Sequence, residues 1–297
     1  MIKKKESGFR LFTKKIISVL LMMILLMVNF IGCGKKEEAP VLRNISFGHG
    51  DKTMVVVPGL SIGYVTDNAE AIEKSFAQFT DEYTVYLFDV RDDVPEDYTM
   101  EQMGEDLVGA IKNLGLKDIY MYGCSMGGME CIYVAGTYPE LVKKVVVASS
   151  ACKANETSDK VVGNWISLAK AGDNHALFED MGQKIYSKAV YEASKDKFAT
   201  MADGITNEAL TRFVNTASAV KGMDLSKKAE AIKCPMLVLG SKGDMVLTPD
   251  ASSQIAEITG AELYMYGEEY PHAVYDEVPN FKDKVLEFFN KDDNKNQ

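Results

Sequence analysis

Short apolar runs alternate with amphipathic segments along most of the chain. Six runs of seven or eight residues are rich in Val, Tyr, Leu and Phe and are bounded by Gly, Pro and Asp: 53–59, 83–90, 118–124, 143–150, 235–241 and 262–268. Runs without a regular polar alternation suit strands that are buried on both faces, as in a parallel sheet. A weaker run at 42–50 predicts a leading strand at the edge of the sheet.

Helical patterns fill the intervals between these runs. Apolar residues recur three or four positions apart, which places them on one side of a helix, in the segments 68–79, 100–116 and 281–289. Regular alternation of strand and helix predicts an α/β fold, with a mostly parallel sheet and helices on both of its faces.

The interval 153–231 breaks this alternation. It contains no convincing strand, and its clearest patterns, at 161–172 and 207–222, are helical. Its length is too great for a plain crossover between two strands of one sheet. We therefore expect an inserted helical cap at 153–231, between two segments, 44–152 and 232–297, that form the core.

A glycine-rich turn separates the run 118–124 from the helical pattern that follows it. Gly123-Cys124-Ser125-Met126-Gly127 fits the G-x-S-x-G pattern, in which a serine nucleophile lies on a sharp turn between a strand and a helix. The glycines allow strand and helix to approach without a Cβ between them. The pattern predicts Ser125 as the nucleophile. It also predicts the Met126 N–H, at the start of the helix, as a donor to a developing oxyanion.

A serine hydroxyl needs a base to take its proton, and the chain has three histidines. In this class the expected order along the chain is nucleophile, acid, histidine, so His272, after the last predicted strand, is the expected base. His49 lies in a turn before the first strong strand. His175 lies in the predicted cap, as a surface residue or a substrate contact.

The acid that orients the histidine should lie on a loop that leaves a strand, between Ser125 and His272. Asp244 follows the run 235–241 and is the expected acid, although an aspartate is also common in ordinary turns. Asp250 is better explained as a residue of the first turn of a helix opened by Pro249.

A second oxyanion donor is expected on the loop after the first strong strand. Pro58-Gly59 end that strand and leave the Leu60 N–H free to turn inward. Donors of this kind contribute about 3 kcal/mol each to stabilising a transition state.

Charge and cysteine content exclude two classes of function. The whole chain has a net charge of −10, and residues 33–297 alone have a net charge of −15. This balance argues against a nucleic-acid partner, whose phosphates need a basic surface. The chain has no CxxC motif and no metal-like spacing, so zinc is not expected. The predicted free thiols are Cys124, Cys131, Cys152 and Cys234.

Residues 1–32 have the pattern of a secretory signal peptide, with a basic segment before an apolar run. Its end, Phe30-Ile31-Gly32-Cys33, resembles the lipobox of bacterial lipoproteins, with Phe where Leu is usual. That resemblance implies cleavage before Cys33, lipidation of Cys33, a linker at 33–43 and attachment to the outer face of a bacterial cell membrane. An uncleaved membrane anchor and ordinary secretion are the alternatives, and each version exports the folded domain.

Residues 41–289 resemble the α/β-hydrolase fold family. The matched positions are Ser125 in the turn, Asp244 after the next-to-last strand and His272 after the last. "FDVRDD", from Phe88, resembles a loop common in the family, with a structural role. The family's frequent His-Gly oxyanion loop is Pro58-Gly59 here.

The resemblance implies acyl transfer to water without a metal or an organic cofactor. We expect a serine hydrolase that cleaves a small ester or related acyl compound. A thioesterase, perhydrolase or aminopeptidase of the same fold would share the triad, and a non-catalytic binding lipoprotein is the alternative of a different class. Three aromatic residues of the predicted cap either line an apolar substrate pocket or belong to the core: Trp165, Phe178 and Phe213.

Overall fold

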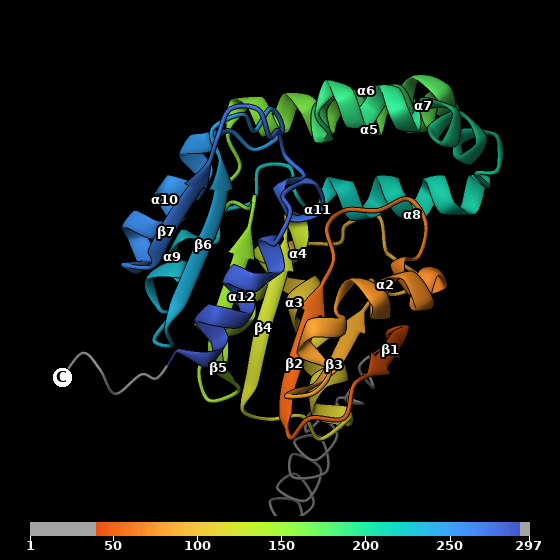
Figure 1. The fold of residues 1–297 in the computed structure, drawn as a ribbon. Coiled ribbons are helices and arrows are strands. Elements are labelled where there is room, and N and C mark those ends of the chain that lie inside the picture. Colours follow the sequence, from red (N-terminus) through yellow and green to blue (C-terminus); the bar gives the residue numbers. More distant parts are fainter. Residues whose placement is uncertain (1–39, 292–297) are drawn as a thin grey trace, which may run out of the picture. The chain divides into compact units, whose positions relative to one another are not determined.

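A seven-stranded sheet forms the centre of the computed structural model, which describes residues 40–291 (Figure 1). The strand order is β1-β3-β2-β4-β5-β6-β7, and all neighbours are parallel except β1 and β3. The strands are β1 (Asn44–Phe47), β2 (Lys52–Val57), β3 (Tyr83–Phe88), β4 (Ile119–Cys124), β5 (Val142–Ala148), β6 (Met236–Ser241) and β7 (Glu262–Tyr266). The predicted α/β fold class and all seven predicted strands are confirmed.

Burial explains why the sequence shows continuous apolar runs. In β5, the side chains from Val145 to Ala148 are fully buried, because helices cover both faces of the central strands. The last strand, β7, lies at the edge of the sheet and leaves Leu263 and Tyr264 exposed.

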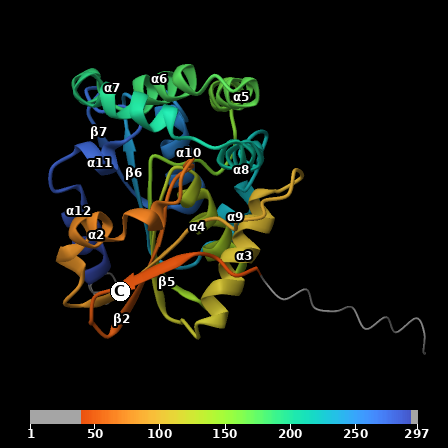
Figure 2. The ribbon, with the colours of Figure 1, turned by 90° about the vertical axis from the view of Figure 1, so that its right-hand side faces the viewer.

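Helices cover the two faces of the sheet (Figure 2). One face carries α3 (Met100–Asn113), α4 (Met126–Thr137), α9 (Ser226–Glu230) and α10 (Pro249–Thr259). The other carries α2 (Ala69–Ser75), the short α11 (Val274–Glu277) and α12 (Phe281–Asn290). The predicted helix at 68–79 is interrupted at Phe76, whose backbone leaves the helical region, and it continues as a 3-10 turn. This break lets Phe76 and Phe79 both pack in the core beneath β3.

Between β5 and β6 the chain forms four helices of 12 to 16 residues, which extend across the carboxyl ends of the strands (Figure 1). They are α5 (Glu156–Ala171), α6 (Asn174–Ile185), α7 (Lys188–Asp203) and α8 (Asn207–Ser218).

The two ends of this helical insertion are joined to each other. Lys153 and Asp224 form an isolated antiparallel bridge and a salt bridge of 2.7 Å. Next to them, the Leu225 N–H donates to the Cys152 carbonyl at 2.7 Å. Helix α9 packs against α4 of the core, so the insertion ends near Asp224, and the stretch up to residue 231 belongs to the connection to β6.

The predicted signal peptide at 1–32 and the predicted lipidation site Cys33 lie outside the described residues. Within residues 40–291, none of the helices has the length and apolar character that spanning a membrane requires.

Candidate active site

Ser125 lies on a strained turn between β4 and α4. Its backbone has φ 52° and ψ −123°, a conformation that residues other than glycine rarely adopt. Four hydrogen bonds hold it there. Its N–H donates to the Ala148 carbonyl at 2.8 Å. Its carbonyl accepts from the N–H groups of Gly128 and Met129 at 3.0 and 3.3 Å and from the Ser150 hydroxyl at 2.8 Å. The turn places a half-buried serine at the first turn of α4, as the G-x-S-x-G pattern predicts.

Two glycines make this turn possible because the backbone on either side is too close for a side chain. A Cβ at Gly123 would lie 2.4 Å from the carbonyl oxygen of Gly127. A Cβ at Gly127 would lie 2.1 Å from the carbonyl oxygen of Val57 on β2. Both distances are well inside van der Waals contact, so neither position accepts even alanine without movement of the backbone.

His272 and Asp244 form a buried pair. The His272 Nδ1 lies 2.9 Å from the Asp244 Oδ2, and the two residues are 2% and 6% exposed. The other carboxylate oxygen accepts from the N–H groups of Val246 and Leu247 at 2.8 and 3.0 Å. With Nδ1–H donating to the carboxylate, Nε2 is left with its lone pair, which is the tautomer a general base needs.

The pair favours an ionised aspartate. Burial opposes the charge on Asp244, but electrostatic attraction to His272, the hydrogen bond with its ring and the two backbone N–H donors outweigh it. The pKa of the carboxyl therefore lies below its ordinary value.

A side chain that the sequence analysis missed joins the two loops of this pair. The Ser241 hydroxyl, at the end of β6, donates to the Tyr270 carbonyl just before His272. The same hydroxyl accepts from the Gly243 N–H, next to Asp244, at 3.0 Å. Ser241 thus fixes the spacing of the loops that carry His272 and Asp244.

Topology brings the three predicted residues to one edge of the sheet. Ser125, Asp244 and His272 follow the ends of β4, β6 and β7, which are parallel and lie within four neighbouring strands. The carboxyl ends of such strands meet at the same edge, where open α/β sheets bind their ligands.

Gly59, which precedes the predicted donor Leu60, and the predicted donor Met126 both lie next to Ser125. Gly59, just before Leu60, approaches so closely that a Cβ there would lie 3.7 Å from the Ser125 Oγ. Met126 is the first residue of α4, where N–H groups have no partner inside the helix. Among the described residues, no hydrogen bond is formed by the N–H of either Leu60 or Met126.

The other candidate residues lie elsewhere. His49 is exposed, and its Nε2 lies 3.7 Å from the Asp81 Oδ1. His175 is exposed on α6, and its Nε2 lies 2.8 Å from the Asp203 Oδ1. Asp250 lies in the first turn of α10, which Pro249 opens as predicted.

The three cap aromatics belong to the core of the domain. Trp165, Phe178 and Phe213 are buried in the same apolar cluster as the residues of α3 and α4. The indole N–H of Trp165 donates to Asp180 at 2.8 Å. None of the three lines the cavity of about 30 Å³ that lies beside the oxyanion loop.

The loop after β3 has structural contacts, as the family resemblance implies. Asp89 accepts hydrogen bonds from the backbone of Val65 and Thr66, each at 2.9 Å, and so holds the segment after the oxyanion loop. Arg91 forms ion pairs with Asp93 and Asp106.

Cysteines and acidic residues offer no metal site within the described part of the chain. The thiols at 124, 131, 152 and 234 are free, and no group of three or more His, Cys, Asp or Glu side chains is placed to hold an ion among residues 40–291.

Glu130 is an acidic residue in the apolar interior that the sequence analysis missed. It lies on α4, one turn after Met126, and is only 4% exposed. Burial, and to a lesser extent the nearby negative charge of Asp106, raises the pKa of its carboxyl to about 8. A charged residue within the otherwise apolar stretch from Met129 to Gly136 is the signal that would have identified it.

The free energy of unfolding of Glu130→Gln is compared with that of the unaltered protein. The difference, variant minus unaltered protein, is expected to be about 4 kcal/mol larger at pH 9 than at pH 5. In the unfolded chain the carboxyl ionises near 4.5, whereas in the folded protein it keeps its proton up to a pKa of about 8. Between these values folding takes up a proton, so the stability of the unaltered protein falls as the pH rises. The amide does not ionise and escapes this loss. Urea unfolding of both proteins at the two pH values measures the effect, and an equal effect at both would contradict it.

Comparison with known proteins places the chain in a family. A sequence model of the α/β hydrolase fold matches residues 52–278. The chain therefore belongs to the α/β-hydrolase fold family and is a hydrolase of that family.

Individual relatives are distant in sequence and similar in fold. A 3-oxoadipate enol-lactonase from Acinetobacter baylyi is 22% identical over 215 residues, which cover 70% of this chain and 77% of the relative. The crystal structure of MGS-M2, an α/β hydrolase enzyme from a Medee basin deep-sea metagenome library, has a TM-score of 0.75 at 24% identity and covers 84% of this chain and 94% of its own. The structure of the enol-lactonase from Burkholderia xenovorans has a TM-score of 0.73 at 21% identity. The match covers 84% of this chain and 96% of the enol-lactonase chain.

Proposed function

We propose that the protein is a serine hydrolase that cleaves a small ester or related acyl compound through an acyl-enzyme. The observation that carries the proposal is the buried His272–Asp244 pair, on loops at the sheet edge where Ser125 occupies its strained turn. A strained non-glycine residue at such a position is characteristic of a functional site. The pairing of histidine and aspartate supplies the base that a serine nucleophile requires.

The proposed reaction has two halves. The Ser125 Oγ attacks the carbonyl carbon while His272 Nε2 takes its proton, and the carbonyl oxygen becomes an oxyanion that accepts from the Leu60 and Met126 N–H groups. The intermediate collapses, the C–O bond to the alcohol breaks, and His272 returns the proton to the leaving oxygen. Water, deprotonated by His272, then attacks the acyl-enzyme and releases the acid and Ser125. Asp244 stabilises the imidazolium in both halves.

A small ester is the favoured substrate class for two reasons. The enol-lactonases similar to this chain are named for lactones, which are internal esters. The cavity beside Gly59 and Met126 is small, about 30 Å³. The direct test is turnover of p-nitrophenyl esters of increasing acyl length by protein with Ser125 intact or replaced.

We also propose that the hydrolase is exported and held on the membrane by lipid attached to Cys33, because residues 1–33 combine a signal-peptide pattern with a lipobox-like end. Cys33→Ala in the full chain, expressed in a bacterium, is expected to move the protein out of the membrane fraction. Unchanged membrane retention of the variant would contradict a lipid anchor and favour an uncleaved helix.

A further inference from the structure

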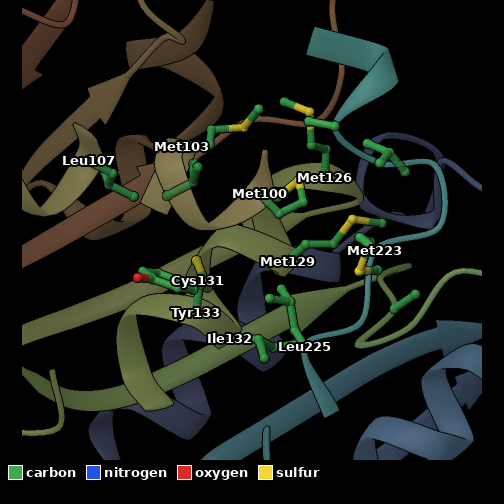
Figure 3. Packing of buried hydrophobic residues seen from close by; sticks show 14 of the residues in the cluster. Met100, Met103, Leu107, Met126, Met129, Cys131, Ile132, Tyr133, Met223 and Leu225 are labelled. Carbon is green, nitrogen blue, oxygen red and sulfur yellow. The ribbon is translucent and has the colours of Figure 1, made fainter. Parts of the chain in front are cut away.

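A small cavity adjoins the proposed nucleophile on the side of the oxyanion loop. It has a volume of about 30 Å³, and Gly59 and Met126, the residues that flank Ser125 in space and in sequence, both line it. Apolar side chains of α3, including Met103 and Leu107, form part of its wall and belong with Met126 to one apolar cluster (Figure 3). Ser125 itself does not line the cavity, but its chain neighbour Met126 and the adjacent Gly59 do, so the cavity lies next to the residue that would carry an acyl group.

A carboxyl group from an almost fully buried side chain lines the cavity. Glu130 lines it, and residues four apart on a helix share a face, so Glu130 lies below Met126 on the side of α4 that meets the cavity. Among the described residues, no hydrogen bond or ion pair is formed by this carboxyl. A polar group buried in this way is costly unless a ligand or water hydrogen-bonds it.

The surroundings keep Glu130 neutral. Nearby Asp106 already accepts from the Tyr98 hydroxyl at 2.6 Å and from Arg91 at 3.4 Å, and its charge opposes a second one. Asp106 on α3 and Cys131 on α4 interact electrostatically with Glu130, and Arg91 pairs with Asp106. The other titratable residues that line the cavity are Tyr64, Asp89, Tyr98 and Arg212. A neutral carboxyl group is a hydrogen-bond donor as well as an acceptor.

The cap contributes a second donor to the same cavity. Arg212 on α8 donates one N–H to the Ile62 carbonyl at 2.6 Å, and its guanidinium lies 3.4 Å above the ring of Tyr64. Since a guanidinium has five N–H donors, Arg212 retains others. Asp89 also lines the cavity, but its oxygens already accept from Val65 and Thr66. A cavity with largely apolar walls, to which Glu130 and Arg212 add hydrogen-bond donors, suits a ligand that is short, largely apolar and provided with an acceptor atom.

We propose that this cavity is the acyl subsite of the enzyme and that Glu130, assisted by Arg212, selects short acyl groups that carry a hydrogen-bond acceptor, such as an ether or keto oxygen. The proposal rests on the serine hydrolase function proposed above. By the same measure of volume one water needs about 10–15 Å³, so the cavity takes the last two or three non-hydrogen atoms of an acyl chain.

The test compares two esters of equal size, p-nitrophenyl methoxyacetate and p-nitrophenyl butyrate, which differ by an ether oxygen in place of a methylene. The readout is the ratio of their kcat/KM values, in which the shared chemistry of Ser125 and His272 cancels. Glu130→Leu is expected to lower the preference for methoxyacetate about tenfold, the size of one lost hydrogen bond. Glu130→Gln keeps a donor and should hold the ratio within about threefold. Glu105→Gln, at a hydrogen-bonded glutamate outside the cavity, is the matched control and should leave it unchanged.

The pH dependence of this ratio gives a readout that needs no variant. In the unaltered protein the preference should fall as the pH rises through about 8, because Glu130 loses its proton and can no longer donate. In Glu130→Gln the ratio should stay level over the same range.

Either of two results would overturn the acyl subsite while leaving the hydrolase in place: an unchanged ratio in Glu130→Leu, or a ratio in the unaltered protein that does not change between pH 6 and pH 9. Because the second result comes from the unaltered protein, it decides the question even if the leucine variant fails to fold. Absence of Ser125-dependent hydrolysis of both esters would instead reject the proposed function and the subsite with it.

Discussion

Ser125→Ala is expected to lower kcat for p-nitrophenyl esters by at least about three orders of magnitude. The substitution removes the only atom that can form the acyl-enzyme in the proposed mechanism. It leaves the oxyanion donors at Leu60 and Met126 in place, so a residual rate above that of water is expected. Steady-state kinetics on both proteins, with esters of two to eight acyl carbons, measure the loss.

Two controls separate lost chemistry from lost structure. Ser167→Ala removes a hydroxyl on α5 that bonds only to the backbone of its own helix, and it should leave kcat unchanged. A fluorophosphonate probe should label the unaltered protein on Ser125, identified by peptide mass spectrometry, and should not label the alanine variant. Similar turnover by the unaltered and Ser125→Ala proteins would reject the serine mechanism, and no labelling of well-folded protein would favour a binding role.

Asp244→Asn is expected to lower kcat by about three to four orders of magnitude near neutral pH. The amide has nearly the same shape, so its oxygen can still accept from the Val246 and Leu247 N–H groups that hold the loop. Its NH2 group then faces His272 Nδ1 and favours the tautomer that carries its proton on Nε2. That tautomer cannot take the proton of Ser125. The loss should therefore appear in kcat without loss of the fold.

Asp250→Asn provides the matched control, because Asp250 lies six residues further on, at the start of α10, and is not part of the buried pair. Its kinetics should equal those of the unaltered protein. Circular dichroism and thermal unfolding establish that Asp244→Asn is folded. A folded Asp244→Asn protein with less than a tenfold loss would mean that Asp244 does not orient the base.

Much of the fold could be predicted because its signals are local. Central strands buried on both faces must be apolar throughout, and that requirement produced the runs of the central strands, including 143–150 for β5. The glycines around Ser125 are also local signals, because Gly123 and Gly127 are required by contacts within a few residues of the turn and with neighbouring β2. His272 and Asp244 followed from chain order once the sheet had been recognised as parallel.

Features that depend on distant contacts could not be predicted in this way. The short α9 (Ser226–Glu230) has one apolar residue and no periodic pattern of its own, so only its packing against α4 distinguishes it from the helical insertion that precedes it. Ser241 is an ordinary serine until Tyr270, 29 positions later, is placed beside it. For Trp165, Phe178 and Phe213, apolar character alone left both core and substrate pocket open.

The bridge between Lys153 and Asp224 has a consequence for how this enzyme can change. Because both ends of the helical segment emerge at the same point, a segment of different length or origin can be grafted there, and the entropic cost of closing the loop grows only slowly with its length. The connection through α9 to β6, and the loops that carry Asp244 and His272, need not move when this exchange occurs. Recombination at a single site could therefore place a different helical segment over the same edge of the sheet.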